Sequence, residues 1–592
     1  MADKSLDQAT TGLDNETYDH KWGFKDTRFV VQPDGMVKVT GNRYALSGTV
    51  MPGLLPFAED TLDIKIDFSD MKPEVAEKHI LPPNRNDAFC AAVAAASPES
   101  RYTFDDRERL VHSHGQTTAD EVNKVLYSRL ERFADMVFYL EGEEDAATLI
   151  KLAAEHDVCL VPYGGGTSVS CALQLPVHEK RMIVSVDTRR MNKIIWIDKE
   201  NMLASVQAGI TGAQLEEELG KQGFVMGHEP DSMELSTLGG WIATNASGMK
   251  KNRYGNIEDI VQNVTMVTPK GVIEHLNTAP RSSIGIQPKQ ILFGSEGNLG
   301  LITKAIIRIH KKPEVTKFGS IVFPTFKAGV DFLYALMQTG VLPASIRLLD
   351  NVQFRFGSAL KPEPTFKDEM MSRVQKLALI NVKGFDPYEL AAATVVMEGS
   401  KDEVAFQSKQ IFGLAKKYGG ISGGEGNGRR GYMLTYAIAY IRDFFADYYI
   451  IGETYETTVP WSKVFDVIDA VDKRARELHA HHQLPGKPYV SPRVTQLYHT
   501  GACIYFTHGF SIKGIEGADE IFSEIERDLR QTILDAGGSL SHHHGIGKLR
   551  KEFMPQTISP TSIELLHDLK AANDPQNIFG VANNVFADGV VD

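Results

Sequence analysis

The chain has 592 residues, which is enough for several domains with ample hydrophobic core. Its composition, 42% hydrophobic and 23% charged, is that of an ordinary globular protein. A formal net charge of −13 argues against a nucleic-acid-binding protein, which would normally carry a surplus of basic residues. That charge does not exclude small anionic substrates, because these need only a local basic pocket.

The sequence shows no clear transmembrane segment and no clear targeting signal. No run of about 18 apolar residues is present, so we expect no transmembrane helix. The start lacks an apolar signal core, and the end does not match the Ser-Lys-Leu type of peroxisomal address. The four cysteines show neither CxxC spacing nor framework density, which favours a reducing compartment.

The first third of the chain changes character at about residue 131. Residues 1–20 are polar, and we expect them to be mobile. Residues 21–130 mix short strand-like runs with Pro/Gly turns, which suggests an N-terminal extension that wraps a later domain. Beyond them, apolar runs predict strands at 136–139, 158–162, 182–186 and 194–197. Helices are predicted at 143–155 and at 211–220, the second opened by a capping box at Thr211.

A second domain is predicted from about residue 313. Amphipathic helices are expected at 327–339, 403–418 and 461–479, and strands at 377–382 and 393–397. Residues 419–431 hold seven glycines and two arginines, so we expect a mobile loop there. The resulting division is an extension (1–130), a first domain (131–313), a second domain (314–540) and a C-terminal segment (541–592). Alternating strands and helices indicate an α/β or α+β fold.

Three segments rich in glycine and hydroxyl side chains are candidates for binding an anionic cofactor. Residues 162–170 follow a predicted strand and contain three consecutive glycines, which let backbone N–H groups approach a phosphate. The spacing is neither that of a dinucleotide-binding Rossmann loop nor that of a Walker A loop. Residues 229–248 and 293–300 are of similar composition. A flexible turn would explain any one segment, whereas all three together favour a long polyanionic ligand.

Three adjacent histidines, His542, His543 and His544, precede a Gly-Ile-Gly sequence. In an extended segment, the first and third would share one face and the second would take the other, so a metal site made from this run alone is not expected. Imidazoles titrate near neutrality, which suits proton transfer or anion binding. A solvated polar loop is the alternative.

Together, these segments resemble the vanillyl-alcohol-oxidase class of FAD-binding proteins, and residues 574–580 resemble the closing segment of that class. The resemblance implies an α+β fold: a two-part FAD-binding domain with an α/β cap domain that binds substrate, and here an N-terminal extension. It implies FAD that is not covalently attached in the resting state. From the residues of this chain we expect no metal. The residues it assigns to FAD are Pro162, Tyr163, Gly164, Gly165, Gly166, Thr167, Ser168, Asp231, Ser232, Met233, Glu234, Leu235, Ser236, Thr237, Thr244, Asn245, Ala246, Ser247, Ser295, Glu296, Gly297, Asn298, Leu299, Gly300 and Leu301.

Within this class, one candidate family is that of the flavin-dependent 2-hydroxy-acid dehydrogenases, which act on D-lactate or glycolate. They carry a Gly-Glu-His-Gly-Ile-Gly loop where this chain has the histidine run. They also carry a His-x-Gly-Asp-Gly-Asn segment that helps to hold a metal and the substrate. Here Ala502 and Ile504 replace the Asp and the Asn, and neither can ligate a metal.

The other candidate is the alkyldihydroxyacetonephosphate synthase (alkylglycerone-phosphate synthase) family, which the chain resembles over nearly its whole length. The segments that carry the resemblance are 21–24, 40–44, 249–259, 501–506 and 542–551. The family makes ether lipids: it exchanges the acyl chain of 1-acyl-dihydroxyacetone phosphate for a long-chain fatty alcohol and releases a fatty acid. The resemblance implies that flavin N5 holds the substrate carbon covalently during the exchange, with no net redox change.

The resemblance also implies roles for three residues of the second domain. Tyr505 would take the proton from the carbon next to the carbonyl. Because a free tyrosine has a pKa of about 10, a cationic neighbour such as Arg442 or a loop histidine must stabilise the phenolate. Arg442 would bind the phosphate or the leaving carboxylate, and Arg347 would organise the flavin site indirectly. The alternatives are a packed strand tyrosine and two arginines in structural salt bridges.

Four histidines complete the expected catalytic set. His543 and His544 would bind phosphate and move the proton between the alcohol and the leaving acid, with His542 as an orienting residue. His228 would face the isoalloxazine ring, or else it is a turn histidine with satisfied hydrogen bonds.

The remaining expectations concern lipids and partners. The apolar stretches 326–342 and 433–451 could line an acyl tunnel, although an amphipathic core is the commoner explanation. The family resemblance implies a peroxisomal location on the luminal side of the membrane, a homodimer, and a dihydroxyacetone-phosphate acyltransferase as a partner. A flavin or lipid carrier without enzymatic activity is a third reading of the chain.

Overall fold

The structure is a computed structural model that describes residues 16–362 and 384–586. The chain divides into two compact units. Unit 1 comprises the residues up to Pro73 together with Pro313–Gly538, and unit 2 comprises Glu74–Lys312 and the residues from Ser539 on. The segment predicted as one N-terminal extension therefore contributes residues to both units. The four-part division at residues 130, 313 and 540 stays a prediction.

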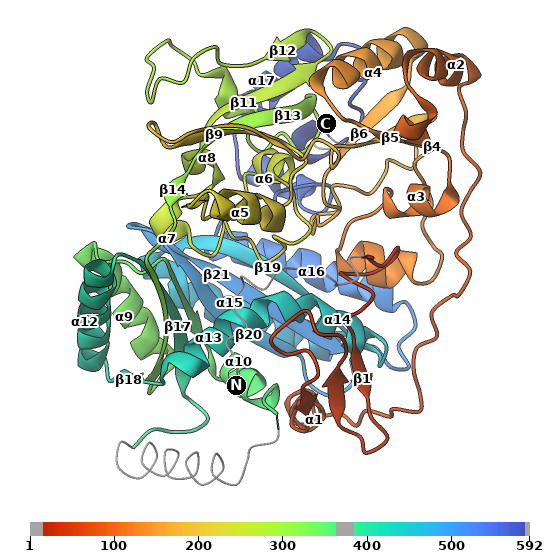
Figure 1. Ribbon diagram of the computed structural model, residues 1–592. Helices are drawn as coiled ribbons and strands as arrows, with labels where there is room; N and C mark the ends of the chain where they lie inside the picture. Colours follow the sequence, from red (N-terminus) through yellow and green to blue (C-terminus); the bar gives the residue numbers. More distant parts are fainter. Residues whose placement is uncertain (1–15, 363–383, 587–592) are drawn as a thin grey trace. The chain divides into compact units, whose positions relative to one another are not determined.

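Unit 2 contains two main sheets (Figure 1). The first has the strand order β4-β5-β7-β6, in which β7 pairs in parallel with both β5 and β6. The second is antiparallel, with the order β12-β11-β13-β9-β8. The strands are β4 (Tyr102–Thr103), β5 (Met136–Tyr139), β6 (Cys159–Tyr163), β7 (Ile183–Asp187), β8 (Ile194–Asp198), β9 (Leu203–Gln207), β11 (Val261–Thr268), β12 (Gly271–Ile273) and β13 (Leu301–Arg308), with a separate pair of β10 (Phe224–Val225) and β14 (His310–Lys311).

Unit 2 also contains helices, some of which pack on these sheets. They are α2 (Asp87–Ala96), α3 (Asp106–Val111), α4 (Glu143–His156), α5 (Gly212–Lys221), α6 (Leu238–Thr244), α7 (Lys251–Tyr254), α8 (Ile257–Ile260) and α17 (Pro560–Asn573). Helix α4 has three acidic residues in its first turn, where they interact favourably with the helix dipole, and it buries the apolar face that the sequence predicts. Thr211 caps α5 by accepting a hydrogen bond from the Gln214 N–H. The strands and helices predicted between residues 136 and 221 are thus confirmed to within about two residues.

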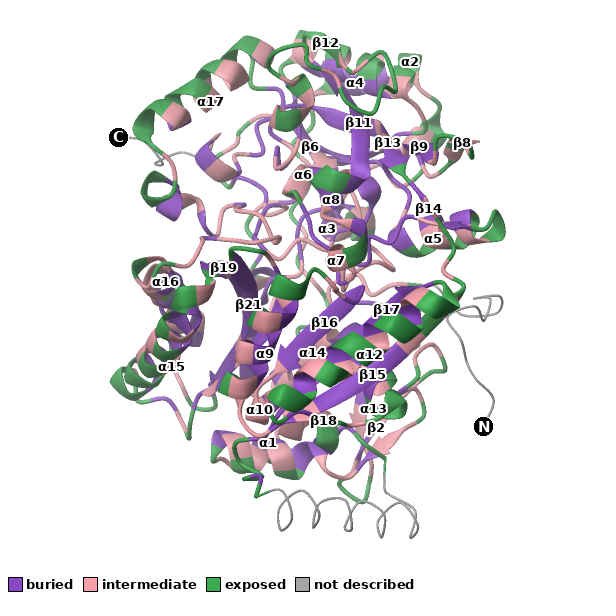
Figure 2. Cartoon of the chain, turned by 90° about the vertical axis from the view of Figure 1, so that its left-hand side faces the viewer, coloured by how far each residue is buried: buried purple, intermediate pink, exposed green. Residues whose placement is uncertain are grey.

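Unit 1 is built on a seven-stranded sheet with the order β18-β15-β17-β16-β20-β21-β19, antiparallel throughout (Figure 2). Its strands are β15 (Val315–Phe323), β16 (Ser345–Leu349), β17 (Ala391–Gly399), β18 (Ile421–Ser422), β19 (Ile450–Pro460), β20 (Tyr489–Leu497) and β21 (Gly501–Ser511). Its helices are α1 (Leu54–Leu62), α9 (Phe326–Thr339), α10 (Asn351–Ala359), α12 (Lys401–Lys417), α13 (Glu425–Met433), α14 (Ile438–Ala446), α15 (Val464–His481) and α16 (Ala518–Asp535). The predicted helices at 327–339, 403–418 and 461–479 are confirmed as α9, α12 and α15.

The mobile loop predicted at residues 419–431 is wrong. The segment forms strand β18 and most of helix α13, which packs on β15 and β17. A Cβ atom on Gly428 would collide with the backbone of Gly319, and one on Gly431 would lie 2.6 Å from the Thr394 side chain. These glycines therefore allow a helix to lie close against a sheet, a use of glycine that looks the same in sequence as a flexible loop.

The N-terminal residues of unit 1 pack on α14. A small sheet of β1 (Phe29–Val31), β2 (Val37–Val39) and β3 (Val50–Met51) shares a hydrophobic cluster with Tyr440 and Phe444. The Phe24 N–H donates to the Tyr440 hydroxyl at 2.9 Å. Within unit 1, the beginning of the chain thus anchors the helix that carries Arg442.

Two predictions fall outside the described residues: the strand at 377–382 and the mobility of residues 1–15. In the part of the chain that the structure describes, no helix is both long enough and apolar enough to cross a bilayer.

Candidate flavin and catalytic residues

The glycine loop at the carboxyl end of β6 lies against the segment before α6. A Cβ atom on Gly165 would collide with the carbonyl of Leu235, and one on Gly164 would lie 2.5 Å from the Thr237 hydroxyl. Only glycine lets the two backbones approach this closely. The structure therefore brings together two of the three segments that the sequence predicts to bind one cofactor.

The third segment joins them through α6 and Pro162. The Glu296 N–H donates to the carbonyl of Ala243 at 2.8 Å, and the Gly294 N–H donates to that of Ile242 at 3.1 Å. A Cβ atom on Gly297 would lie 3.2 Å from the Pro162 ring. All three segments, distant in sequence, thus meet in unit 2.

Several side chains assigned to FAD hold these segments in place. The Ser236 hydroxyl accepts from the Trp241 indole at 2.8 Å, and Thr237 caps α6. The Thr244 hydroxyl donates to the carbonyl of Gly240, and the Ser247 hydroxyl donates to Asn256. Other members, Leu299 and Leu301, are buried in hydrophobic clusters. Contact of these residues with FAD stays a prediction.

Two polar side chains in this region are buried without a partner among the described residues. Both ring nitrogens of His228, which is 1% exposed, lack a hydrogen bond, as does the Ser295 hydroxyl. The His228 ring packs against Trp241 with 4.7 Å between centroids, and burial lowers its pKa to about 3. An unsatisfied buried imidazole is costly unless a ligand supplies the missing bonds. Together with the glycine loop, these atoms fit a polar cofactor such as FAD.

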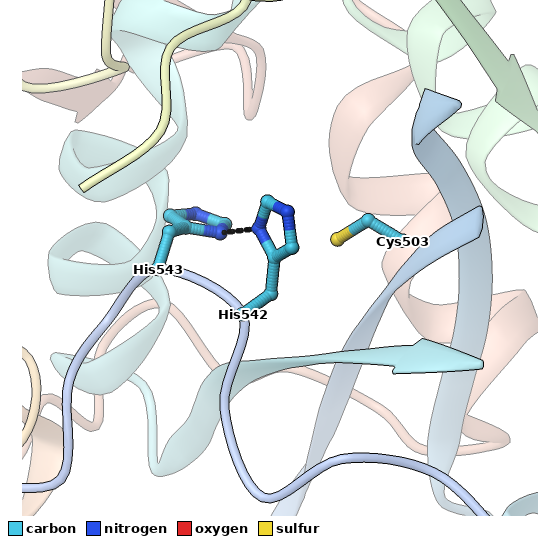
Figure 3. A group of neighbouring side chains, drawn as sticks. All are labelled: Cys503, His542 and His543. Carbon is cyan, nitrogen blue, oxygen red and sulfur yellow. Dashed lines mark hydrogen bonds between the residues drawn. The ribbon is translucent and has the colours of Figure 1, made fainter. Parts of the chain in front are cut away.

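The three loop histidines turn toward one another and not to opposite faces. His542 and His543 share a hydrogen bond of 2.8 Å between their Nδ1 atoms, and their rings are nearly perpendicular (Figure 3). The rings of His543 and His544 lie 4.5 Å apart. The extended geometry assumed from the sequence is wrong here, because the segment is a series of bends and not a strand. Neighbouring imidazoles in contact can pass a proton between them.

A buried carboxylate holds the backbone that follows the histidines. Glu296 accepts hydrogen bonds from the N–H groups of Ile546, at 2.5 Å, and Gly547, at 2.9 Å. Burial raises the pKa of Glu296 and lowers that of the nearby Lys548 to about 8. The Lys548 ammonium donates to the Asn583 side chain at 2.8 Å. Glu296, which the sequence assigns to FAD, thus fixes the histidine loop with its side chain.

A segment that was not predicted from the sequence borders the glycine loop. The Gln116 N–H donates to the carbonyl of Ser168 at 2.7 Å. Nearby, the His112 ring packs at an angle against Tyr163, with 4.3 Å between ring centroids, and its Nε2 atom lies 3.0 Å from Asp187. The hydrogen bond of His112 and the Arg189 guanidinium, 2.6 Å from Asp187, hold the pKa of that carboxyl well below its usual range despite its burial, so a network of polar and charged groups adjoins the loop. The unusual His-Ser-His-Gly sequence at 112–115 was the available signal.

Tyr505 lies on β21 in unit 1 and is 9% exposed. Its hydroxyl is 3.1 Å from that of Thr454 on β19. The guanidinium of Arg493 on β20 lies over the Tyr505 ring, 4.2 Å from its centroid. The sequence predicts a cationic neighbour that stabilises the Tyr505 phenolate, but it does not point to Arg493 as that neighbour.

The two predicted arginines occupy different places in unit 1. Arg442 on α14 donates twice to its neighbour Asp443, at 2.8 and 2.9 Å. Arg347 on β16 is buried and donates to the Thr435 hydroxyl at 2.6 Å. Tyr505, Arg442 and Arg347 belong to unit 1, whereas His228 and the three loop histidines belong to unit 2. The catalytic roles of all these residues stay predictions.

Comparisons with known proteins agree with this arrangement. Residues 134–277 match the family model "FAD binding domain", and residues 312–581 match "FAD linked oxidases, C-terminal domain". The alkyldihydroxyacetonephosphate synthase of Caenorhabditis elegans is 42% identical over 95% of this chain and 94% of its own length. The chain belongs to the alkyldihydroxyacetonephosphate synthase family.

Other members of this synthase family support the assignment. The Dictyostelium discoideum synthase is 32% identical over 94% of this chain and 92% of its own. A solved structure of an alkyldihydroxyacetonephosphate synthase superposes with a TM-score of 0.83 at 29% identity, covering 95% of this chain and 98% of that one. The predicted α+β fold, with an FAD-binding domain and a cap domain, is therefore confirmed. The chain is an FAD-dependent enzyme of this family.

Proposed function

We propose that the enzyme exchanges the acyl chain of 1-acyl-dihydroxyacetone phosphate for a long-chain fatty alcohol, giving 1-alkyl-dihydroxyacetone phosphate and a fatty acid. The observation that carries this proposal is the 42% identity, over nearly the full length of both chains, to the alkyldihydroxyacetonephosphate synthase of Caenorhabditis elegans. The exchange has no net redox change and leads to ether lipids.

The residues of the flavin region would position FAD mainly by backbone groups. The glycine loop would bind the pyrophosphate through its N–H groups. His228, uncharged because burial lowers its pKa to about 3, would complete its hydrogen bonds on the isoalloxazine side. When bound, FAD supplies through N5 a covalent attachment point for the substrate carbon.

Proton transfer falls to Tyr505 and the histidines. Tyr505 would remove the proton from the carbon next to the carbonyl, since it is a buried phenol with a cation over its ring. His543 and His544 would move the proton between the incoming alcohol and the leaving acid and bind phosphate, and the hydrogen bond between His542 and His543 supports such a transfer. Arg442 would pair with the phosphate or the carboxylate.

The test is an exchange assay with palmitoyl-dihydroxyacetone phosphate and labelled hexadecanol. We expect labelled ether product without any electron acceptor. Reduction of an acceptor by lactate or glycolate, with no ether formed, would instead establish the dehydrogenase reading. Tyr505→Phe should retain FAD and lose turnover, whereas unchanged function of this variant would point to a carrier.

A variant of the loop tests the phosphate role. Relatives among the 2-hydroxy-acid dehydrogenases carry Glu where this chain has His543. His543→Glu should reduce turnover of the phosphate-bearing substrate far more than it weakens FAD binding. Equal losses would mean that the loop is only structural.

We also propose peripheral contact with a membrane, where the long-chain substrates reside. Unit 2 exposes three aliphatic side chains within residues 276–286: Leu276 (89%), Ile284 (61%) and Ile286 (93%). Their transfer into a lipid interface would be favourable. Flotation with phospholipid vesicles should recover the protein, and Ile284→Asp with Ile286→Asp should reduce recovery. Equal recovery of both proteins would exclude this loop as the contact.

The location and the partners complete the proposal. A luminal peroxisomal site, a homodimer and a dihydroxyacetone-phosphate acyltransferase partner follow from the family. Imaging of the tagged protein, sedimentation at several concentrations and co-purification with the acyltransferase test these points one by one. No nucleic-acid partner is expected from the acidic net charge.

A further inference from the structure

Three side chains form a row across strands β19, β21 and β20 of unit 1. Residue pairing in the antiparallel sheet places Glu456 opposite Tyr505 and Arg493 opposite Tyr505 on its other side. Directly opposed residues point to the same face of a sheet. A carboxylate, a phenol and a guanidinium therefore follow one another on a single face, and all three are buried: Glu456 is 2%, Tyr505 9% and Arg493 6% exposed.

The contact between Arg493 and Tyr505 is face-on. The guanidinium carbon lies 4.2 Å from the centre of the ring, well within the range of a cation–π interaction. At this distance a guanidinium also interacts with the negative charge of an ionised phenol, and shielding from water strengthens that interaction. The hydroxyl remains beside the Thr454 hydroxyl at 3.1 Å, so it is oriented by a neutral group.

Several other charged or titratable groups lie near Tyr505 in unit 1. Cys503 precedes it by two residues on β21 and lies on the same face, and the charges that act on this thiol are those of Glu456, Arg493 and Arg347. Arg442 belongs to α14, which packs on β19, and is paired with Asp443. Two guanidinium groups, Arg493 and Arg347, thus stand against one carboxylate, Glu456. Of these, Arg493 lies over the ring of Tyr505.

We propose that Arg493 is the positioning residue that makes Tyr505 an effective base, by holding its ring and stabilising its phenolate, while Glu456 on the opposite side limits this effect. The inference rests on the proposed function, in which Tyr505 accepts the substrate proton. It goes beyond that function because it assigns the cation on which the tyrosine depends to β20 and not to the histidine loop or α14.

The experiment is a pair of titrations on the full-length, FAD-loaded enzyme. Ionisation of Tyr505 without substrate is followed by ultraviolet absorbance, as the difference between each protein and the same protein carrying Tyr505→Phe. The pH dependence of ether formation is measured in parallel. We expect Arg493→Met to move both midpoints to higher pH by about one unit, which is an approximately tenfold loss of turnover at neutral pH that alkaline pH restores.

Two further variants test the size and the sign of the expected shift in the titration midpoints. Arg493→Lys keeps a charge and should move the midpoints less than Arg493→Met, which also covers the case in which the methionine variant fails to fold. Glu456→Gln removes the opposing charge and should move the midpoints to lower pH. Arg476→Met, on the exposed face of α15, is the matched control and should leave both titrations unchanged.

The outcomes separate the inference from the proposed function. Ionisation of Tyr505 at the same pH in the Arg493→Met and unsubstituted enzymes would overturn the inference, whatever the turnover. A midpoint that moves in the absorbance titration but not in the turnover profile would support the contact and overturn the role of Tyr505 as the base.

Discussion

Replacement of Glu296 by glutamine tests how the histidine loop is held. The carboxylate accepts two hydrogen bonds from the loop backbone, at Ile546 and Gly547, across 250 and 251 residues of sequence. In Glu296→Gln one oxygen can still accept, but the amide NH2 group faces the second N–H donor. A lost bond to a charged acceptor, with a buried donor left unpaired, costs about 2–3 kcal/mol.

Hydrogen exchange measures this cost directly. The amides of Ile546 and Gly547 should exchange about 30- to 100-fold faster in the variant, because 1.4 kcal/mol corresponds to about a factor of ten in the opening equilibrium. Turnover should fall by a similar factor if the positions of the histidines matter, while FAD affinity changes little. Unchanged hydrogen-exchange protection of the loop peptide would refute this reasoning. A loss of FAD affinity as large as the loss of turnover would show that the main role of Glu296 is to bind FAD.

The matched control is Glu216→Gln in the same unit. Glu216 is half-buried and accepts from two backbone N–H groups with the same oxygen, from Met226 at 3.1 Å and from Gly227 at 2.7 Å. Because glutamine keeps one carbonyl oxygen, this variant can retain both hydrogen bonds, and it should leave the histidine loop protected. Loss of protection in the histidine loop of this variant would show that the effect of Glu296→Gln is general destabilisation.

Three further predictions concern glycines and histidine titration. Gly428→Ala should destabilise the protein by about 1–3 kcal/mol because the new Cβ atom collides with β15. Gly426→Ala in the same helix has open space around its Cβ atom and should stabilise the protein by about 0.5–1 kcal/mol. Both free-energy changes are measured by denaturant titration, and both would be near zero if the segment were a mobile loop. Gly165→Ala should abolish FAD retention on a desalting column, while Gly220→Ala, which has open space around it, should retain the cofactor. Burial lowers the pKa of His508 to about 3, so between pH 6.5 and 5 the unfolded state takes up this proton and the folded state does not, and stability should fall by about 1.6 kcal/mol over that range. His508→Leu should flatten that decline in urea unfolding and exposed His499→Leu should not; identical slopes for all three proteins would contradict it.

Much of the local structure was predictable from the sequence because its causes are local. The apolar face of α4, the Thr211 cap of α5 and the strands of the first sheet each depend on residues within one or two turns. The three glycine-rich segments were also recognisable as one cofactor site, since each carries its own signal in composition. Glycine composition alone misled at residues 419–431, where the cause is the close approach of another backbone.

The reactive residues of the candidate site were recognisable from the sequence, whereas their neighbours are set by the fold. Residue types identified Tyr505 and the histidine run as chemically interesting, but not the neighbours on which their chemistry depends. Arg493 reaches Tyr505 through the register of the β20–β21 pair, and a shift of one residue would turn it to the other face. Glu296 reaches the histidine loop because two segments far apart in sequence pack in one unit. The sequence by itself thus determined the family, the cofactor and the local elements, whereas only the tertiary structure decided which charges surround each reactive group, because register and packing between distant segments leave no local pattern.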